Sequence, residues 1–278
     1  MFALRNFSRT CYSALLGLGI VLTASLHPAT AALLAQDDFN YGTGALSGQN
    51  GGSGWAGSWI ASANASVVDP LVDLSGNRAL AISGNNNSAA WRSLATAYAG
   101  SEVFVSFEMQ LASGTLNNND FVSLWFDNVT TGSHTNTPQL GIKANGSGVN
   151  DVFVRTRGTA GSFAAGSNVT AGQTFTLVGR LSKSGSGNYD RFDLWFNPDA
   201  ATAGAADASF TGNSGLSSLQ WLGLRSANLD AGDTVLIDRL RIGTTWADVS
   251  PVPEPAAPLL AGCGLLLFMC LRRTRWMR

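Results

Sequence analysis

The sequence predicts an all-β protein whose body folds as a two-sheet antiparallel jelly-roll sandwich. Along residues 36–250, apolar and polar residues alternate with a period of two, which is typical of half-buried strands. The 278 residues include 32 glycines but only 2 lysines and 3 glutamates, whereas helical proteins are rich in Glu and Lys. No segment of this region carries a long apolar stripe with a period of 3.6, so helices are not expected in its core.

Each strand is expected where an alternating or apolar run lies between turn residues. In the clearest run, apolar residues at every second position from Val103 to Leu111 share one face. The other expected strands are Leu80–Ser83, Ala89–Leu94, Phe121–Asp127, Gln139–Ala144, Val152–Arg157, Phe175–Leu181, Phe192–Asn197, Leu219–Arg225 and Val235–Ile242. About ten strands without helices between them predict a sandwich or jelly roll, and not a parallel α/β sheet.

Residues 1–31 have the order of a secretory signal peptide. Arg5 and Arg9 precede a short apolar run at 11–26, and Ala29-Thr30-Ala31 fits the rule for a cleavage site. The run is short for a membrane span of about 20 residues, which favours cleavage near Ala31 over a retained anchor. We therefore predict an N-terminal signal helix and export of the rest of the chain.

Residues 250–278 contain three ordered parts. Pro253-Glu254-Pro255 is a rigid, extended tripeptide, because each proline fixes φ and lacks an N–H donor. An apolar run follows at 256–271, and as a helix it would extend about 24 Å, slightly less than a ~30 Å hydrocarbon core. The arginines that end the chain are Arg272, Arg273, Arg275 and Arg278. The sequence therefore predicts a C-terminal transmembrane helix followed by a cytoplasmic basic cluster.

These three parts together resemble the PEP-CTERM sorting signal of Gram-negative bacteria. The resemblance covers roughly residues 252–278. It implies insertion into the inner membrane, recognition of the Pro-Glu-Pro motif by an exosortase-type sorting protease, and cleavage near that motif. An ordinary tail anchor would explain the helix and the arginines, but not the motif. The implied location is transient anchoring in the inner membrane, followed by the cell surface or the extracellular matrix.

The body, residues 32–249, is similar at both ends to laminin-G-like and concanavalin-A-like jelly rolls. Its opening reads DDFNYGTGALSGQNGGSGWAGSW and its closing reads VLIDRLRIGTTWADV. The resemblance implies two curved antiparallel sheets with paired terminal strands, so we expect Asp37–Phe39 close to Val235–Ile242. Many such domains bind carbohydrate and some cleave glycans, so the fold alone does not decide the function.

The charge distribution excludes nucleic acid as a partner. Six of the 17 basic residues lie at the chain ends, so the rest of the chain carries 11 basic against all 18 acidic residues, a formal charge of −7. Nucleic acid would repel such a body. The body also has no cysteine, so disulfides and thiolate chemistry are excluded from it.

Residue types suited to catalysis are scarce in the body. His134 is the only histidine outside residues 1–31, and its polar loop predicts a solvated side chain and not a catalytic base. Laminarinase-like jelly rolls carry a Glu-x-Asp-x-x-Glu strand, but between Glu102 and Glu108 there is no aspartate. We therefore predict that the protein is not an enzyme. A glycan-cleaving enzyme of the jelly-roll glucanase type is the alternative.

Carbohydrate binding has more support in the strand pattern. Sugar rings stack on aromatic side chains, and polar side chains bind their hydroxyl groups. Alternation groups tryptophans with polar residues on the strand faces. The predicted glycan-binding residues are Trp125, Asp127, Arg155, Asp193 and Trp195. Two alternatives remain open, because the tryptophans could fill the core and the domain could be purely structural.

A structural calcium ion is expected, if anywhere, at the paired ends of the domain. Asp38 and Asp238 lie in the two terminal segments, and carboxylate oxygens are ligands that Ca²⁺ prefers. Ordinary turn aspartates are the alternative, because the sequence has no EF-hand spacing. The resulting prediction is an exported cell-surface or matrix protein, non-catalytic, with extracellular polysaccharide as its ligand.

Overall fold

The computed structural model describes residues 33–250, apart from 70–73, 75–77, 118, 147–148, 186 and 199–202. The predicted signal peptide lies outside the described residues, and so do the predicted sorting residues. These are Pro253, Glu254, Pro255, Arg272, Arg273 and Arg275. Within the part that the structure describes, no helix is both long and apolar enough to cross a membrane.

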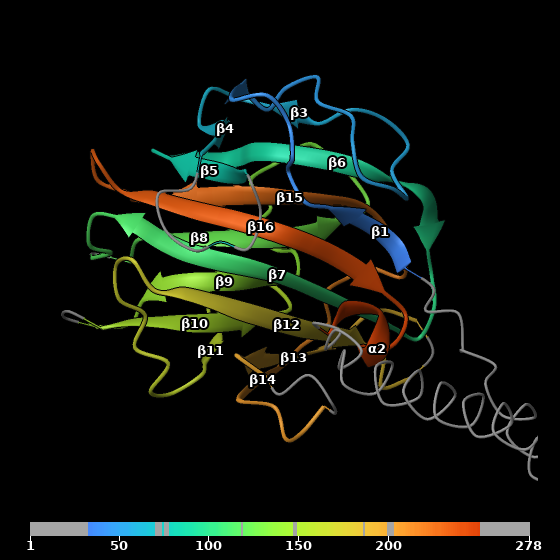
Figure 1. Ribbon diagram of the computed structural model, residues 1–278. Coiled ribbons are helices and arrows are strands. Elements are labelled where there is room, and N and C mark those ends of the chain that lie inside the picture. Colours follow the sequence, from blue (N-terminus) through green and yellow to red (C-terminus); the bar gives the residue numbers. More distant parts are fainter. Residues whose placement is uncertain are drawn as a thin grey trace, which may run out of the picture. The chain divides into compact units, whose positions relative to one another are not determined.

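Two antiparallel sheets pack face to face (Figure 1). In spatial order, the nine-stranded sheet contains β14 (Ala208–Thr211), β13 (Arg191–Phe196), β12 (Thr174–Ser182), β7 (Glu102–Ser113), β16 (Thr234–Gly243), β5 (Ala79–Ser83), β4 (Ala65–Val68) and β2 (Gly44–Ala45), with β1 (Leu33–Asp37) also paired to β16. The seven-stranded sheet contains β11 (Ser162–Phe163), β10 (Asn150–Arg155), β9 (Gln139–Ala144), β8 (Phe121–Asp127), β15 (Leu219–Ala227), β6 (Asn86–Tyr98) and β3 (Ile60–Ala61). The prediction of an all-β, two-sheet antiparallel sandwich is therefore confirmed.

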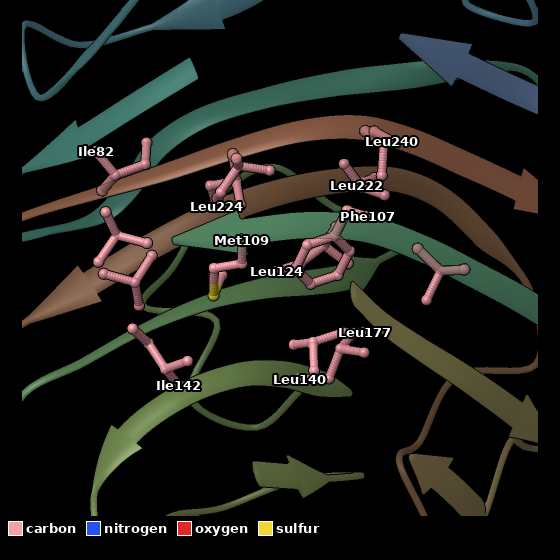
Figure 2. Packing of buried hydrophobic residues seen from close by; sticks show 14 of the residues in the cluster. Ile82, Phe107, Met109, Leu124, Leu140, Ile142, Leu177, Leu222, Leu224 and Leu240 are labelled. Atoms are coloured by element: carbon pink, nitrogen blue, oxygen red, sulfur yellow. The ribbon is translucent and has the colours of Figure 1, made fainter. Parts of the chain in front are cut away.

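The core lies between the two sheets and follows the predicted alternation. The predicted inner face of β7 is buried, and it packs against inner residues of β8, β9 and β15 (Figure 2). All ten expected strands are present. The strands that the sequence did not predict are β1, β2, β3, β4, β11 and β14, each of which has only two to five residues.

The two ends of the domain are paired, as predicted. Asp37 of β1 lies opposite Leu240 of β16, and Gln36 lies opposite Arg241. After β16, Thr245 is the N-cap residue of the short helix α2 (Trp246–Val249), and the Asp248 carboxylate accepts hydrogen bonds from the backbone N–H groups of Thr244 and Thr245. These hydrogen bonds fold the end of the domain back onto the nine-stranded sheet.

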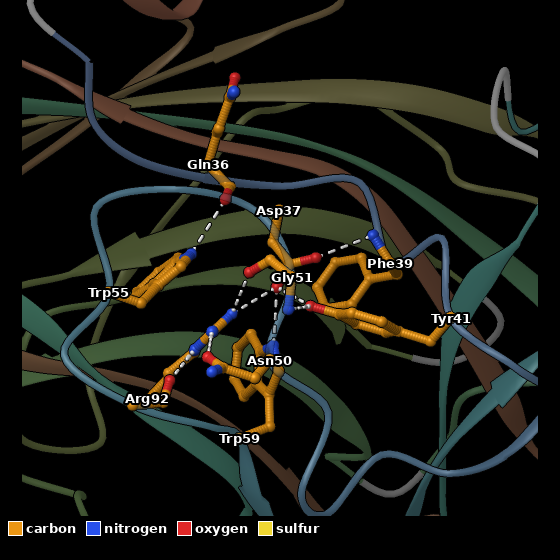
Figure 3. Close-up of polar contacts among 10 residues, drawn as sticks. Gln36, Asp37, Phe39, Tyr41, Asn50, Gly51, Trp55, Trp59 and Arg92 are labelled. Carbon is orange, nitrogen blue, oxygen red and sulfur yellow. Dashed lines mark hydrogen bonds and ion pairs between the residues drawn. The ribbon is translucent and has the colours of Figure 1, made fainter.

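A buried polar network holds β1 in place (Figure 3). Asp37 Oδ2 accepts hydrogen bonds from Arg92 Nη1 at 2.8 Å, Trp59 Nε1 at 2.8 Å and Tyr41 Oη at 2.6 Å. Its Oδ1 accepts the backbone N–H of Phe39 at 2.9 Å. Burial raises the pKa of Asp37, and these four donors oppose that effect. The network joins β1, the glycine-rich loop after it and β6, so it is a structural feature of the fold.

Candidate functional site

Three of the five predicted glycan-binding residues lie on the outer face of the seven-stranded sheet. Trp125 and Asp127 belong to β8 and Arg155 to β10, and each alternates with residues that face the core. One row across five strands contains Arg155, Gln139, Trp125, Gly223 and Trp91. With neighbouring strands about 4.8 Å apart, this row extends about 19 Å across the face.

Trp125 is fully buried although it lies on an outer face. Its ring stacks on the imidazole of His134, with centroids 3.6 Å apart and an interplanar angle of 6°. It also lies against Gly223, where a Cβ atom would collide with the indole. Trp125 therefore neither joins the core between the sheets nor offers an open ring to a sugar.

The prediction of a solvated His134 is wrong. The β8–β9 loop folds back over the sheet, with His134 at a positive φ of 50°, and buries the ring. His134 Nδ1 lies 3.0 Å from Asp127 Oδ2, and Nε2 is buried without a hydrogen-bond partner among the described residues. Stacking on Trp125 and the Asp127 carboxylate together hold the imidazole in this place.

Arg155 is oriented by Gln139. Arg155 Nη2 donates to Gln139 Oε1 at 2.6 Å, and Ser123 Oγ donates to the same oxygen at 3.0 Å. The guanidinium Cζ lies 5.5 Å from the ring centroid of Phe121. Its Nε is buried without a partner in the described region, and its Nη1 makes only a long contact of 3.4 Å with the carbonyl oxygen of Thr159. Arg155 therefore has two nitrogen donors, Nε and Nη1, that make no short hydrogen bond with the described residues.

Arg225 of β15 approaches the same phenyl ring. Its Cζ lies 5.0 Å from the centroid of Phe121, and its Nη2 donates to Asn87 Oδ1. Its Nη1 is 3.5 Å from Thr135 Oγ1, and its Nε is another buried atom for which the described residues supply no partner. Two guanidinium groups thus converge on one ring.

Lys143 of β9 adds a third positive charge, and we call Lys143, Arg155 and Arg225 the cationic cluster. Burial lowers the pKa of Arg155 to about 10, and the charge of Arg225 adds to the effect. Burial likewise lowers the pKa of Arg225 to about 10, and burial together with Arg155 lowers that of Lys143. Among the described residues, no carboxylate oxygen lies within 4.0 Å of these three side chains. The cluster therefore has no anionic partner there.

An open polar hollow of about 580 Å³ borders the cationic cluster beside Arg225. Its lining residues are Asn85, Asn86, Asn87, Ser88, Gly132, Ser226, Ala227 and Asn228. Amide and hydroxyl groups of this kind can both donate and accept hydrogen bonds. They are suited to a ligand with many hydroxyl groups.

Asp193 and Trp195 do not belong to this face, which corrects the predicted single surface of five residues. Both lie on β13, in the other sheet, so they face the opposite side of the sandwich. Alternation showed that they share a polar face, but the sheet to which each strand belongs depends on long-range pairing. Trp195 is covered by α2, because the ring of Trp246 lies 5.1 Å from it.

Asp193 is also engaged in two ion pairs and a hydrogen bond with a hydroxyl group. Arg180 Nη2 donates to it at 2.7 Å, Arg191 Nε at 2.8 Å and Ser209 Oγ at 2.5 Å. Burial alone would raise the pKa of Asp193, but these hydrogen bonds outweigh burial and lower it. Asp193 is therefore occupied by internal contacts.

Asp38 directly follows β1, and Asp238 lies in its partner strand β16. Asp238 Oδ1 accepts the backbone N–H of Arg239 at 2.7 Å, and its buried Oδ2 has no hydrogen-bond partner in the described part of the chain. Burial raises the pKa of Asp238 to about 7, and Glu108 and Asp38 add to this effect. Asp38 Oδ1 is 3.3 Å from Arg241 Nη1. Calcium binding at this pair stays a prediction.

The sequence reasoning missed Gln139, Lys143 and Arg225. Arg225 was identifiable, because it alternates with Trp221 on the polar face of an expected strand. The other two can be recognised as site residues only from the register of the strands, which places Gln139 opposite Arg155 and Lys143 opposite Phe121. Such cross-strand neighbours cannot be read from a single strand.

Several solved structures are similar to this chain, at low sequence identity and with TM-scores below 0.5. An endo-β-1,4-glucuronan lyase from the fungus Trichoderma reesei is 17% identical, with a TM-score of 0.47, and the match covers 79% of this chain and 98% of that chain. An endo-1,3-β-glucanase from Streptomyces sioyaensis is 15% identical, with a TM-score of 0.41, and the match covers 79% of this chain and 98% of that chain. A xylan-binding CBM22 domain from Paenibacillus barcinonensis is 15% identical, with a TM-score of 0.35, and the match covers 77% of this chain and 94% of that chain. Neither a protein-family model nor a curated protein matches the sequence.

The prediction that the protein is not an enzyme does not hold. Several similar structures are named as enzymes that act on glycans, including the lyase and the glucanase above. The absence of one glucanase motif was too narrow a basis for that prediction, because one fold can host more than one chemistry. At these identities and TM-scores the comparisons assign no reaction to this chain.

Proposed function

We propose that the protein binds an acidic polysaccharide on the outer face of the seven-stranded sheet, with the sugar carboxylates against Arg155 and Arg225. The observation that carries this proposal is the cationic cluster, in which two buried guanidinium groups meet without a carboxylate partner among the described residues. A buried charge is stabilised by an opposite charge, so the cluster favours an anionic ligand.

Two of the present contacts of Arg155 and Arg225 are long enough for a ligand carboxylate to replace them. Thr159 O and Thr135 Oγ1 lie 3.4 and 3.5 Å from the guanidinium groups, at the long limit for a hydrogen bond. A carboxylate that replaced them would form shorter, charge-assisted bonds. Both contacts come from loops that border the face, so a ligand could displace them without disturbing the sheet.

The surroundings of the cluster favour a sugar polymer over a small anion. The face extends about 19 Å across five strands, and Trp91 and Trp221 are only half-buried on it. Half-exposed indole rings can stack on the C–H faces of sugars. The asparagine-rich hollow supplies partners for hydroxyl groups.

Affinity electrophoresis of the full-length protein tests this proposal. We expect retardation in gels that contain alginate or polygalacturonate, and none in gels that contain the neutral glucan laminarin. Arg155→Gln removes one charged donor, and hydrogen bonds to charged groups contribute about 1.5–3 kcal/mol. It should therefore weaken binding at least about tenfold.

Arg157→Gln is the matched control, since it makes the same change of charge two residues away. Arg157 is exposed and donates to the carbonyl oxygen of Asn213 at 3.2 Å, away from the cationic cluster. Its variant should bind like the wild type. Equal retardation by laminarin, or full binding by a folded Arg155→Gln variant, would contradict the proposal.

Cleavage of the bound glycan is the second candidate function, and His134 favours it. A carboxylate that orients an imidazole, whose other nitrogen has no partner in the described structure, is an arrangement suited to proton transfer. Because Nε2 is buried, the β8–β9 loop must move to admit a substrate. The same acidic polymers, incubated with the protein and measured for chain length, show whether this occurs. Unchanged length in the presence of bound protein would exclude cleavage and leave the binding proposal intact.

We also propose that the domain reaches the cell surface or matrix by the route that its terminal segments indicate. Support comes from the signal-peptide pattern at 1–31 and the Pro-Glu-Pro motif at 253–255 with its apolar run and arginines. Processing at both ends predicts an intact mass for surface-extracted protein that lacks residues 1–31 and the segment beyond the motif. A mass that includes Cys263 and Cys270 would show that the tail is a retained anchor.

A further inference from the structure

Two loops lie side by side at one end of the sandwich, outside the cationic cluster. They are the β7–β8 connection and the turn between β15 and β16. Ser113 Oγ donates to the carbonyl oxygen of Gly232 at 2.6 Å, and Asn228 Nδ2 donates to that of Asn119 at 3.2 Å. These contacts join segments more than 100 residues apart in sequence and fix their relative position.

Three carboxylates from these loops converge. Asp120, Asp230 and Asp233 each offer an oxygen atom, and these atoms all lie within 4.8 Å of one another. Uncharged amide groups of the loops donate hydrogen bonds to them: Asn117 to Asp120 and Asp230, and the backbone N–H groups of Thr115 and Asp230 to Asp233. No Lys or Arg side chain of the described residues forms a salt bridge with any of the three. Three like charges thus repel one another without a compensating cation.

Asp120 indicates that a cation belongs here. Its side chain is fully buried and faces the other two carboxylates, and its Oδ1 has no hydrogen-bond partner in the described part of the chain. Asn117 N occupies only Oδ2, at 2.7 Å. A buried acceptor without a donor is destabilising, and a charged one more so. A metal ion would coordinate this oxygen and would also offset the repulsion between the three carboxylates.

We propose that Asp120, Asp230 and Asp233 bind a calcium ion. All three ligands are hard oxygen donors, with no histidine or cysteine among them, which disfavours zinc. Calcium accepts irregular sets of carboxylate and backbone oxygens, whereas magnesium requires a near-octahedral shell that usually retains several waters. This site is distinct from the Asp38 and Asp238 pair and independent of the proposed glycan face. Its role is to clamp the two loops.

Thermal melting of the full-length protein tests the site. After treatment with EDTA and dialysis, CaCl₂ should raise the melting temperature in a saturable way, and MgCl₂ at equal concentration should raise it much less. Asp230→Asn removes one charge from an exposed ligand and keeps an acceptor for Asn117 Nδ2. It should raise the melting temperature of the metal-free protein, because repulsion falls, and abolish the response to calcium.

Two control variants show which aspartates bind the calcium that raises the melting temperature. Asp207→Asn makes the same change at an exposed aspartate that accepts the backbone N–H of Phe196, and it should respond to calcium like the wild type. Asp238→Asn should also retain the response. No calcium effect on the wild type, or an effect that survives in Asp230→Asn, would overturn the proposal. An effect lost only in Asp238→Asn would move the site to the terminal strands.

Discussion

Asp37→Ala is expected to lower the free energy of unfolding by about 3–5 kcal/mol, the range for removing one partner of a buried ion pair. Asp37 and Arg92 are each only 1% exposed, and the carboxylate is the shared acceptor of the network around β1 (Figure 3). Without it, the buried guanidinium of Arg92 loses its carboxylate partner and keeps only uncharged oxygen acceptors. The indole N–H of Trp59 loses the acceptor of its hydrogen bond. Since a domain is typically stable by only about 5–15 kcal/mol, this loss is a large fraction of the total.

Asp38→Ala is the matched control for this prediction, because it removes the neighbouring carboxylate. The Asp38 side chain is 44% exposed and pairs with Arg241 at 3.3 Å, and surface ion pairs of this kind contribute about 0–1 kcal/mol. Urea unfolding, followed by tryptophan fluorescence, should separate the two variants clearly. Similar small losses for both would mean that the network does not hold β1.

Trp125→Ala is expected to lower the free energy of unfolding by about 3–5 kcal/mol, as for a large buried aromatic side chain. The indole is 0% exposed and is packed between structural neighbours, because His134 stacks on it and Gly223 leaves space for it. Its removal would leave a cavity beneath the β8–β9 loop and release the imidazole. We therefore expect a large fall in melting temperature.

Trp221→Ala tests the same residue type on the same face. Trp221 lies in β15 and is only half-buried, so its loss should change stability by much less. If Trp125→Ala melts like the wild type and loses only glycan binding, the stacked arrangement described above is wrong. Gel retardation in alginate, measured on both variants, distinguishes a loss of fold from a loss of ligand contacts.

The strands and their faces were predictable, whereas the composition of the site was not. The alternation of β7 identified its buried face correctly, and the terminal segments pair as their resemblance to jelly rolls implied. The predicted glycan surface, in contrast, mixed residues of two sheets. Trp125 and Trp195 have the same local pattern of polar neighbours, and nothing within either strand distinguishes the sheet to which it belongs.

What the sequence by itself determined is local: a period of two, turn residues between runs, and an excess of apolar residues on one face of each strand. These properties depend on backbone geometry over a few residues, so they can be read without a partner. The tertiary structure alone decided which faces meet. Arg155 and Arg225 converge on Phe121 because β10, β9, β8 and β15 pair in that order, which joins strands about 70 residues apart. Register and strand order are set by the burial of the whole core, and the cationic cluster and the aspartates of the loops follow from them.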